Sequence, residues 1–310
     1  MSIATGSLLY LIFAFIPALD GAANFFAPIL DAALPLFMFL VLYVTFCKVD
    51  FRKLIPVGWH LWIAVSQVLM VAVVIGAILF FHVTGKSLIL LEALLTCIIC
   101  PCASAAAVVT QKLGGNLEEM TTYTFLSNFL CALLIPVCFP LLDAEADITF
   151  WSAFVAILYK VCLVLVVPMI LAYITKHWHT LCRFYQWVIS MNNLSYYLWG
   201  CSLLIVSGTT VKNIVHAEVA VSFLLLIAVL ALILCLIQFA MGRYIGHFFR
   251  STINAGQALG QKNTAFAIWI AYTYLNPLST VGPGCYILWQ NIINSVEIWR
   301  NDHAIKRKNK

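Results

Sequence analysis

The sequence predicts an all-α membrane protein with about ten transmembrane helices. Three observations lead to this fold class: the composition, a series of apolar segments and the placement of basic residues. Of the 310 residues, 64% are hydrophobic and 9% are charged, and the mean hydropathy is +1.01. Soluble domains carry roughly 25% charged residues, so this chain lacks the charge that a water-exposed surface needs. A lipid-facing surface needs none, because the helices satisfy their own backbone groups.

Apolar segments of about 20 residues, the length that crosses a bilayer, follow one another with short connections. They lie near 3–19, 27–47, 57–83, 88–112, 118–142, 149–175, 185–209, 217–246, 252–275 and 279–299. No hydrophilic domain interrupts them. We therefore expect a single polytopic transmembrane domain over 1–310, ending in a basic tail at 301–310.

The basic residues gather in alternate connections and in the tail. Only Lys86 and Lys212 lie on one side of the predicted membrane, and Lys160 and Lys262 lie inside segments. The other side carries Lys48, Arg52, Lys53, Lys112, Lys176, Arg183, Arg243, Arg250, Arg300, Lys306, Arg307, Lys308 and Lys310. Basic residues mark the cytoplasmic side. We therefore expect an integral protein of the plasma membrane, which is the inner membrane in bacteria, with both termini on the cytoplasmic side. The basic tail is expected to contact anionic lipid. The net charge of +5 reflects this bias, and no nucleic-acid partner is expected.

The fourth and ninth segments are interrupted. The fourth contains Pro101, and the ninth contains Gly256 and Gly260 within a polar stretch at 254–264. Proline removes a helix hydrogen bond and glycine loosens the backbone. In lipid, such a break is tolerated only where protein or a water-filled cavity satisfies the freed groups.

The two breaks lie five segments apart, which predicts two inverted five-helix repeats at about 1–143 and 148–300. In transporters with such repeats, paired broken helices form a binding site near the midplane. Their half-helix N-termini attract anions. The alternative is that both breaks are packing faces of small residues. That alternative fits the fourth segment well, but it leaves Gln261, Lys262 and Asn263 of the ninth unexplained, and an ionisable residue within a membrane segment indicates function.

Motifs along nearly the whole chain resemble those of a known family. The fourth and fifth segments carry Cys100-Pro101, Ser104-Ala105 and Gly114-Gly115-Asn116, and the ninth carries Gly260-Gln261-Lys262-Asn263-Thr264. The tenth carries Pro283-Gly284 and Trp289-Gln290-Asn291, the third has Gln67, and the second is rich in Met and Phe at 36–40. These motifs are similar to those of the bile acid:sodium symporter family, of which the chain resembles a divergent bacterial member. The resemblance implies a panel domain, a core domain and two broken helices that cross, and it implies symport of organic anions with sodium.

The chain departs from the family pattern where relatives bind sodium. A Ser-Asn pair of the family corresponds to Ala106 and Ala107, a glutamate to Ala258, and a glutamine to Lys262. Alanine offers no side-chain oxygen, and an ammonium repels a neighbouring cation. Sodium is therefore a doubtful partner, although Gln67 and Thr124 remain as possible ligands, and no other cofactor or metal is expected.

Lys262 could take the place of the missing cation. Burial disfavours the charged form of a lysine, so this residue could exchange a proton during transport. It could also be a fixed charge in uncoupled transport or exchange. The alternative is a lysine that snorkels to the interface. Its place between Gln261 and Asn263 argues against this alternative.

We expect a small organic anion, either bile-acid-like or a small carboxylate, beside the crossing. The expected substrate contacts are Ser104, Asn263, Thr264, Gln290 and Asn291, and the expected cation-site or coupling residues are Lys262, Gln67, Thr124 and Gln261. Lys160 could face the cavity, pair with Glu92 or Glu297, or snorkel. Asn192 and Asn193 could link helices or line the cavity.

Other functions fit the sequence less well. An enzyme needs converging catalytic groups, whereas all seven histidines lie near segment ends or outside segments, so no catalytic residue is expected. Cys100 and Cys102 flank Pro101, but no histidine lies near them to complete a metal site. A channel would need rings of carbonyls or like charges. A sensor that binds an organic anion on the same fold without moving it remains the alternative. The oligomeric state stays open.

Overall fold

The computed structural model describes residues 2–16, 20–142, 149–191, 194–215 and 219–308. Throughout these ranges the regular structure is helical, apart from an isolated β-bridge between Cys102 and Lys262. Five of the described segments are apolar and long enough to cross a membrane: Pro28–Cys47, Gly58–Phe80, Leu117–Leu141, Phe150–His177 and Val221–His247. The predicted class, an all-α membrane protein, is confirmed.

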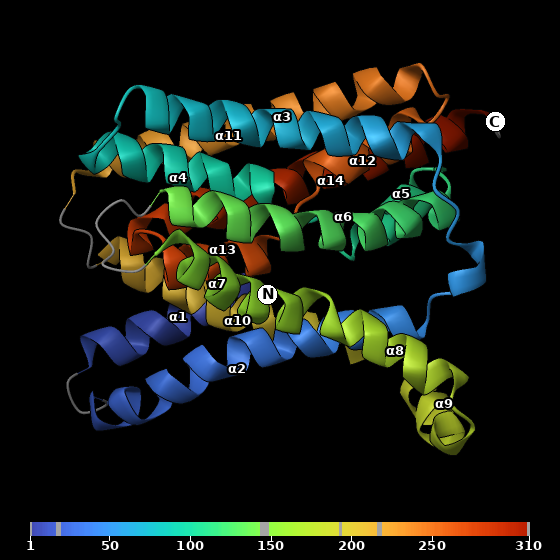
Figure 1. Cartoon of the computed structure of the whole chain (residues 1–310), viewed down its shortest axis with the longest axis horizontal. Coiled ribbons are helices and arrows are strands. Elements are labelled where there is room, and N and C mark those ends of the chain that lie inside the picture. The colour runs from blue at the N-terminus through green and yellow to red at the C-terminus, as the bar shows by residue number, and fades with distance from the viewer. Residues whose placement is uncertain (1, 17–19, 143–148, 192–193, 216–218, 309–310) are drawn as a thin grey trace.

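The α-helices run back and forth along the long axis of the molecule (Figure 1). They are α1 (Ser2–Phe15), α2 (Asp20–Cys47), α3 (Gly58–Phe80), α4 (Gly85–Ile99), α5 (Ala106–Lys112), α6 (Leu117–Cys138), α7 (Phe150–Leu165), α8 (Val167–His177), α9 (Cys182–Ser190), α10 (Leu194–Val215), α11 (Val221–His247), α12 (Thr252–Gly260), α13 (Thr264–Tyr274) and α14 (Val281–Lys308). Short 3-10 turns lie at Phe51–Lys53 (η2), Phe139–Leu141 (η3), His179–Leu181 (η4) and Pro277–Thr280 (η5).

Several boundaries differ from the sequence prediction, and the largest differences are at 185–209 and at the C-terminal tail. The segment expected at 185–209 is divided into α9 and α10, and α9 projects from one end of the bundle (Figure 1). α9 has nine residues, too few to cross a membrane, and it exposes the side chains of Arg183, Phe184 and Trp187. The tail expected at 301–310 is not a separate segment, because α14 continues to Lys308.

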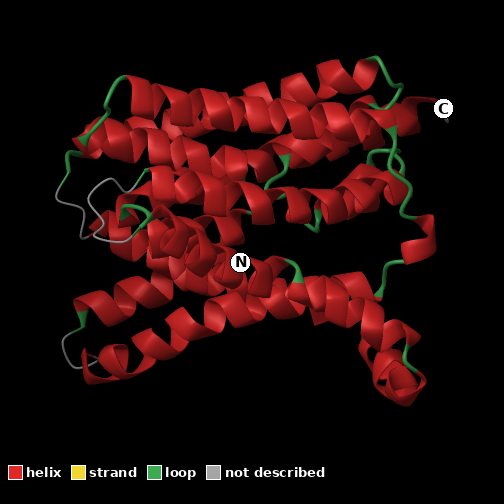
Figure 2. Ribbon diagram, in the orientation of Figure 1, coloured by secondary structure: helices red, strands yellow, loops and turns green. Residues whose placement is uncertain are grey.

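The helices pack in two groups. The lower group in Figure 2 contains α1, α2, α8 and α10, which contact one another in the order α1–α10–α2–α8. The second group is centred on α11, α12 and α14. Close approach within it depends on Gly242, because a Cβ there would lie 2.3 Å from the carbonyl oxygen of Ala255.

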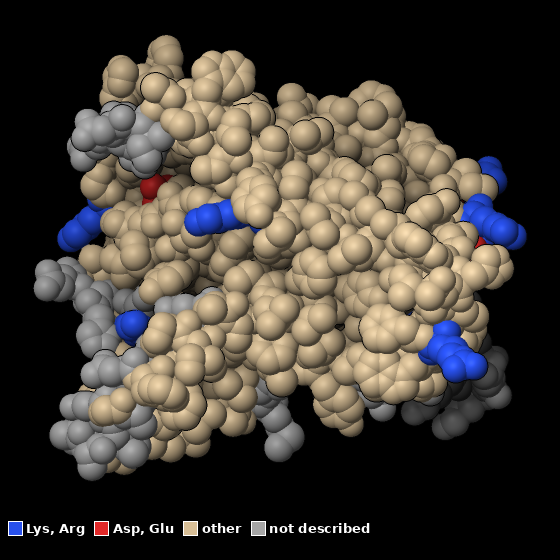
Figure 3. Space-filling model, turned by 60° about the horizontal axis from the view of Figure 1, so that its bottom comes forward, with Lys and Arg blue, Asp and Glu red and all other residues tan. Residues whose placement is uncertain are grey.

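The outer surface suits lipid. Large apolar side chains such as Trp62 and Val73 of α3 and Leu225 of α11 are exposed. On the face in Figure 3, most Lys, Arg, Asp and Glu side chains lie toward the two ends, with largely uncharged surface between them. This arrangement, with few charges along the middle of the bundle, is what a surface in contact with lipid requires.

Candidate functional site

The two broken segments meet each other. Between α4 and α5 the helix is interrupted at 100–105, where the chain is extended at Cys100 and turns at 104–105. Between α12 and α13 it is interrupted at 261–263. The Ala103 N–H donates to the Gln261 carbonyl at 3.0 Å, and the Asn263 N–H donates to the Pro101 carbonyl at 2.9 Å. The extended pieces thus pair as two very short strands, which satisfies backbone groups that the breaks release from their helices. Both breaks lie where the sequence predicts them.

The C-terminal end of α4 is satisfied by a buried lysine and a buried glutamine. Lys262 Nζ donates to the carbonyl oxygens of Ile98 at 3.0 Å and Cys100 at 3.3 Å. Gln67 Nε2 lies 3.0–3.2 Å from the carbonyl oxygens of Ile98, Ile99 and Cys100. A cation is stabilised at this negative end of a helix. The Lys262 side chain is 1% exposed, which excludes snorkelling to the interface.

The C-terminal end of α12 is satisfied by neutral groups. The Tyr286 hydroxyl donates to the Gly260 carbonyl at 2.8 Å and accepts from Gln238 Nε2 at 3.0 Å. Gln238 Nε2 also donates to the Cys97 carbonyl at 3.2 Å, which links the network back to α4. Neither Tyr286 nor Gln238 was among the predicted site residues. An intramembrane polar residue at 238 was the signal available for the glutamine.

Gln290 of α14 holds the backbone of Lys262. Its Oε1 accepts from the Lys262 N–H at 2.9 Å, and its Nε2 donates to the Lys262 carbonyl at 3.2 Å. This reciprocal pair fixes the extended backbone from which the lysine side chain reaches α4. Gln290 therefore positions Lys262, and its amide is already engaged before any ligand binds.

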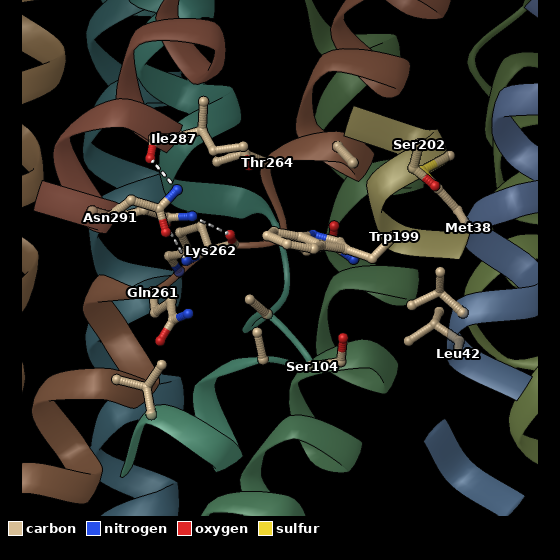
Figure 4. Close-up of a pocket in the computed structure, with 17 residues that line it drawn as sticks. Met38, Leu42, Ser104, Trp199, Ser202, Gln261, Lys262, Thr264, Ile287 and Asn291 are labelled. Atoms are coloured by element: carbon tan, nitrogen blue, oxygen red, sulfur yellow. Dashed lines mark hydrogen bonds between the residues drawn. The ribbon is translucent and has the colours of Figure 1, made fainter. Parts of the chain in front are cut away.

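A cavity of about 190 Å³ lies beside the two breaks (Figure 4). One wall comes from α2 and α10, and the other comes from both breaks and α14. All five predicted substrate contacts lie on its lining, together with Lys262 and Gln261. The complete lining is Met38, Val41, Leu42, Ala103, Ser104, Ala105, Val109, Trp199, Ser202, Gln261, Lys262, Asn263, Thr264, Ala265, Ile287, Gln290 and Asn291. Sequence reasoning missed the α2 and α10 residues, because their approach to the breaks is a tertiary feature.

The polar side chains on this lining differ in how far they are engaged. Asn263 Oδ1 accepts from the Phe266 N–H at 3.3 Å and so caps α13, whereas its Nδ2 makes no hydrogen bond with the described chain. Asn291 Nδ2 donates to the Ile287 carbonyl at 2.8 Å. Within the described ranges, the Ser104 hydroxyl makes no hydrogen bond. The Ser104 hydroxyl and Asn263 Nδ2 can therefore bind a ligand without breaking an existing contact.

Two predicted coupling residues lie away from the cavity. The Gln67 side chain reaches from α3 to the end of α4, and the Thr124 hydroxyl donates to the Met120 carbonyl within α6 at 3.0 Å. Ala106 and Ala258 are buried and bring no side-chain oxygen to the breaks. The Gln261 Oε1 atom is buried without a hydrogen-bond partner in the described part of the chain.

Lys160 forms neither predicted ion pair. Its side chain is exposed on α7, with Nζ 5.8 Å from the centre of the Tyr274 ring. Glu297 pairs with Arg243, and Glu92 accepts from the Ser279 hydroxyl at 2.6 Å. Asn192 and Asn193 lie outside the described residues.

Comparison with known proteins gives a family for the chain. No curated protein matches it. The model of the SBF-like CPA transporter family matches residues 51–288, which include both breaks and the paired residues between them. Its relation to the bile acid:sodium symporters confirms the resemblance found in the sequence motifs. The match covers well over half of the chain, and the protein therefore belongs to the SBF-like CPA transporter family.

Proposed function

We propose that this protein is a secondary active transporter that moves a small organic anion by alternating access, with Lys262 in the place of a coupling cation. The observation that carries the proposal is the buried Lys262 ammonium, bound to the carbonyls of α4 beside a cavity lined by polar side chains. Membership of a transporter family supports the general role. The anion, the coupling and the transport cycle are our inference.

The electrostatics of the cavity favour an anion. Lys262 is 1% exposed, and within the described ranges it forms no ion pair with a carboxylate. Its charge is therefore weakly screened and acts on the cavity. α13 begins at Thr264 on the cavity lining, so the positive end of that helix also faces the ligand. The Ser104 hydroxyl and Asn263 Nδ2 would donate hydrogen bonds to a carboxylate or sulfonate.

The order of helices supports two inverted repeats and ten crossings. The series α1, α2, α3, broken α4–α5 and α6 corresponds to α7–α8, α10, α11, broken α12–α13 and α14. In this proposal the repeats cover about 1–143 and 148–300 of a single domain, both termini are cytoplasmic in the bacterial inner membrane, and 301–310 is a basic cytoplasmic extension. The group α1, α2, α8 and α10 is the panel, the second group is the core, and rocking between them exposes the cavity alternately.

Sodium is not required in this mechanism. The carbonyls at the end of α4, which a bound cation would need, already accept from Lys262 and Gln67. If Lys262 loses its proton during the cycle, transport is proton-coupled. If it stays charged, transport is uncoupled or proceeds by exchange.

The test begins with thermal stabilisation of the purified protein by a panel of organic anions, in sodium, in potassium and at two pH values. Ligands found this way are then tested for uptake into proteoliposomes under imposed sodium or proton gradients. We expect stabilisation and uptake of a small carboxylate or sulfonate in the absence of sodium. Uptake that requires sodium, and that persists unchanged in Lys262→Met, would contradict the proposal. Binding without uptake would indicate a sensor instead.

A further inference from the structure

A second cavity of about 170 Å³ lies next to the first. It is lined by α1, α10, α13 and α14, and most of its wall is apolar. Two of its hydroxyl groups are turned to their own helix: Ser207 donates to the Leu203 carbonyl at 2.8 Å, and Thr210 donates to the Val206 carbonyl at 2.9 Å. This cavity therefore suits hydrocarbon rather than a charged group.

The two cavities lie next to each other along the same helices. On α10, Ser202 lines the first cavity and Leu203 lines the second, and on α13 the corresponding residues are Ala265 and Ile268. Among the described residues, Ile287 of α14 is the one side chain that lines both. It is 5% exposed, and in Figure 4 it lies beside Thr264 and Asn291 at one end of the first cavity. Ile287 thus forms the partition between a polar cavity and an apolar one.

The volume of each cavity limits what it can hold. A buried cavity of about 150 Å³ accommodates benzene, which has six non-hydrogen atoms, so the first cavity holds an anion of roughly six to eight non-hydrogen atoms. Pockets for drug-sized ligands measure about 300–1,000 Å³, and only the two cavities joined would enter that range.

We propose that Ile287 is a specificity-determining residue that closes the apolar end of the anion cavity. On the function proposed above, the protein then takes compact organic anions. It excludes anions whose hydrocarbon chain would have to pass Ile287 into the second cavity. Shortening this side chain joins the cavities and admits longer anions.

The test compares binding of propionate, butyrate, hexanoate, octanoate and decanoate, with a parallel series of alkanesulfonates, by the full-length protein in detergent. In the wild type we expect affinity to be highest for short chains and to fall from octanoate onward. In Ile287→Ala the affinity for octanoate should rise by about tenfold or more, because each additional buried methylene contributes about a fourfold gain. Affinity for propionate should change little.

Three variants serve as controls. Ile287→Leu keeps the side-chain volume and should keep the wild-type ranking. Ile292→Ala removes the same atoms from α14 at a position that is 53% exposed and lines neither cavity, so it should also keep that ranking. Val206→Phe, added to Ile287→Ala, fills the second cavity and should restore the preference for short chains. If Ile287→Ala does not fold, Ile287→Val should still shift the ranking toward longer chains.

Two outcomes separate this inference from the function on which it rests. If the wild type binds decanoate as tightly as butyrate, or if a folded Ile287→Ala or Ile287→Val keeps the wild-type ranking, the role of Ile287 is wrong while anion binding stands. If no carboxylate or sulfonate binds to any variant, both the proposed function and the role of Ile287 are overturned.

Discussion

Replacing Lys262 with methionine removes the ammonium but keeps a side chain of similar length. The wild-type ammonium donates two hydrogen bonds, to the carbonyls of Ile98 and Cys100. A hydrogen bond to a charged group contributes about 1.5–3 kcal/mol, and an orphaned buried acceptor costs about 1–3 kcal/mol. Gln67 Nε2 stays within reach of both carbonyls, so neither is fully orphaned. Methionine also avoids burying a charge, which offsets part of the loss.

These opposing effects lead us to expect Lys262→Met to lower the free energy of unfolding by about 1–3 kcal/mol. Adding Gln67→Leu removes the second donor and should cost more than the sum of the two single changes, because each donor compensates for loss of the other. Lys262→Arg should impair stability or transport as well, because a planar guanidinium does not fit a compact cation site. Lys86→Met, at an exposed position in the first turn of α4, is the matched control.

Stability is measured by thermal unfolding in detergent, and function by uptake into proteoliposomes with and without sodium. We expect Lys262→Met to lose uptake of the anion found in the ligand panel, whereas Lys86→Met retains it. If Lys262→Met is as stable as the wild type and moves substrate with the same ion dependence, the assignment of the ammonium to the cation position is wrong.

Two further predictions concern the cavity lining. Ser104→Ala should weaken anion binding by about fivefold, the value of one hydrogen bond. It should leave thermal stability unchanged, because the hydroxyl has no partner in the described chain. Ser66→Ala on the apolar helix α3 is the control, and an equal loss of binding in both variants would exclude direct contact between Ser104 and the anion. Gln290→Met should lower the free energy of unfolding by about 1–3 kcal/mol, because it orphans the buried Lys262 N–H; a thermal unfolding midpoint equal to that of the wild type would show that the Gln290–Lys262 pair does not hold the break.

The breaks could be predicted from sequence because their signals are local. Pro101 interrupts a helix because proline lacks a backbone N–H, which is evident from the residue type alone. A polar stretch that contains a lysine is equally evident in an apolar segment. The same locality explains the error at 185–209. α9 carries apolar aromatic residues, so its composition resembles the start of a membrane segment, although it is only nine residues long.

The contacts that organise the site could not be predicted in the same way. Gln290 bonds the backbone of Lys262 from 28 residues away, and Lys262 reaches the carbonyl of Ile98 from 164 residues away. Which amide meets which backbone group depends on how α14 and α4 pack against the breaks. Gln290 was therefore expected to contact substrate, whereas its amide is engaged by the protein. The position of Ile287 between the two cavities could not be predicted from sequence either, because both cavities are formed by packing between helices.

The two half-helix ends offer a comparison that separates charge from simple hydrogen bonding. The end of α4 is satisfied by an ammonium, whereas the end of α12 is satisfied by the Tyr286 hydroxyl, which donates to the Gly260 carbonyl at 2.8 Å. Tyr286→Phe orphans that carbonyl and leaves the ring in place, so it should lower the free energy of unfolding by about 1–3 kcal/mol, much as Lys262→Met does. Because no charge is removed, the ion and pH dependence of uptake should stay as in the wild type. If Tyr286→Phe altered that dependence as strongly as Lys262→Met, integrity of the breaks rather than the charge of Lys262 would control coupling.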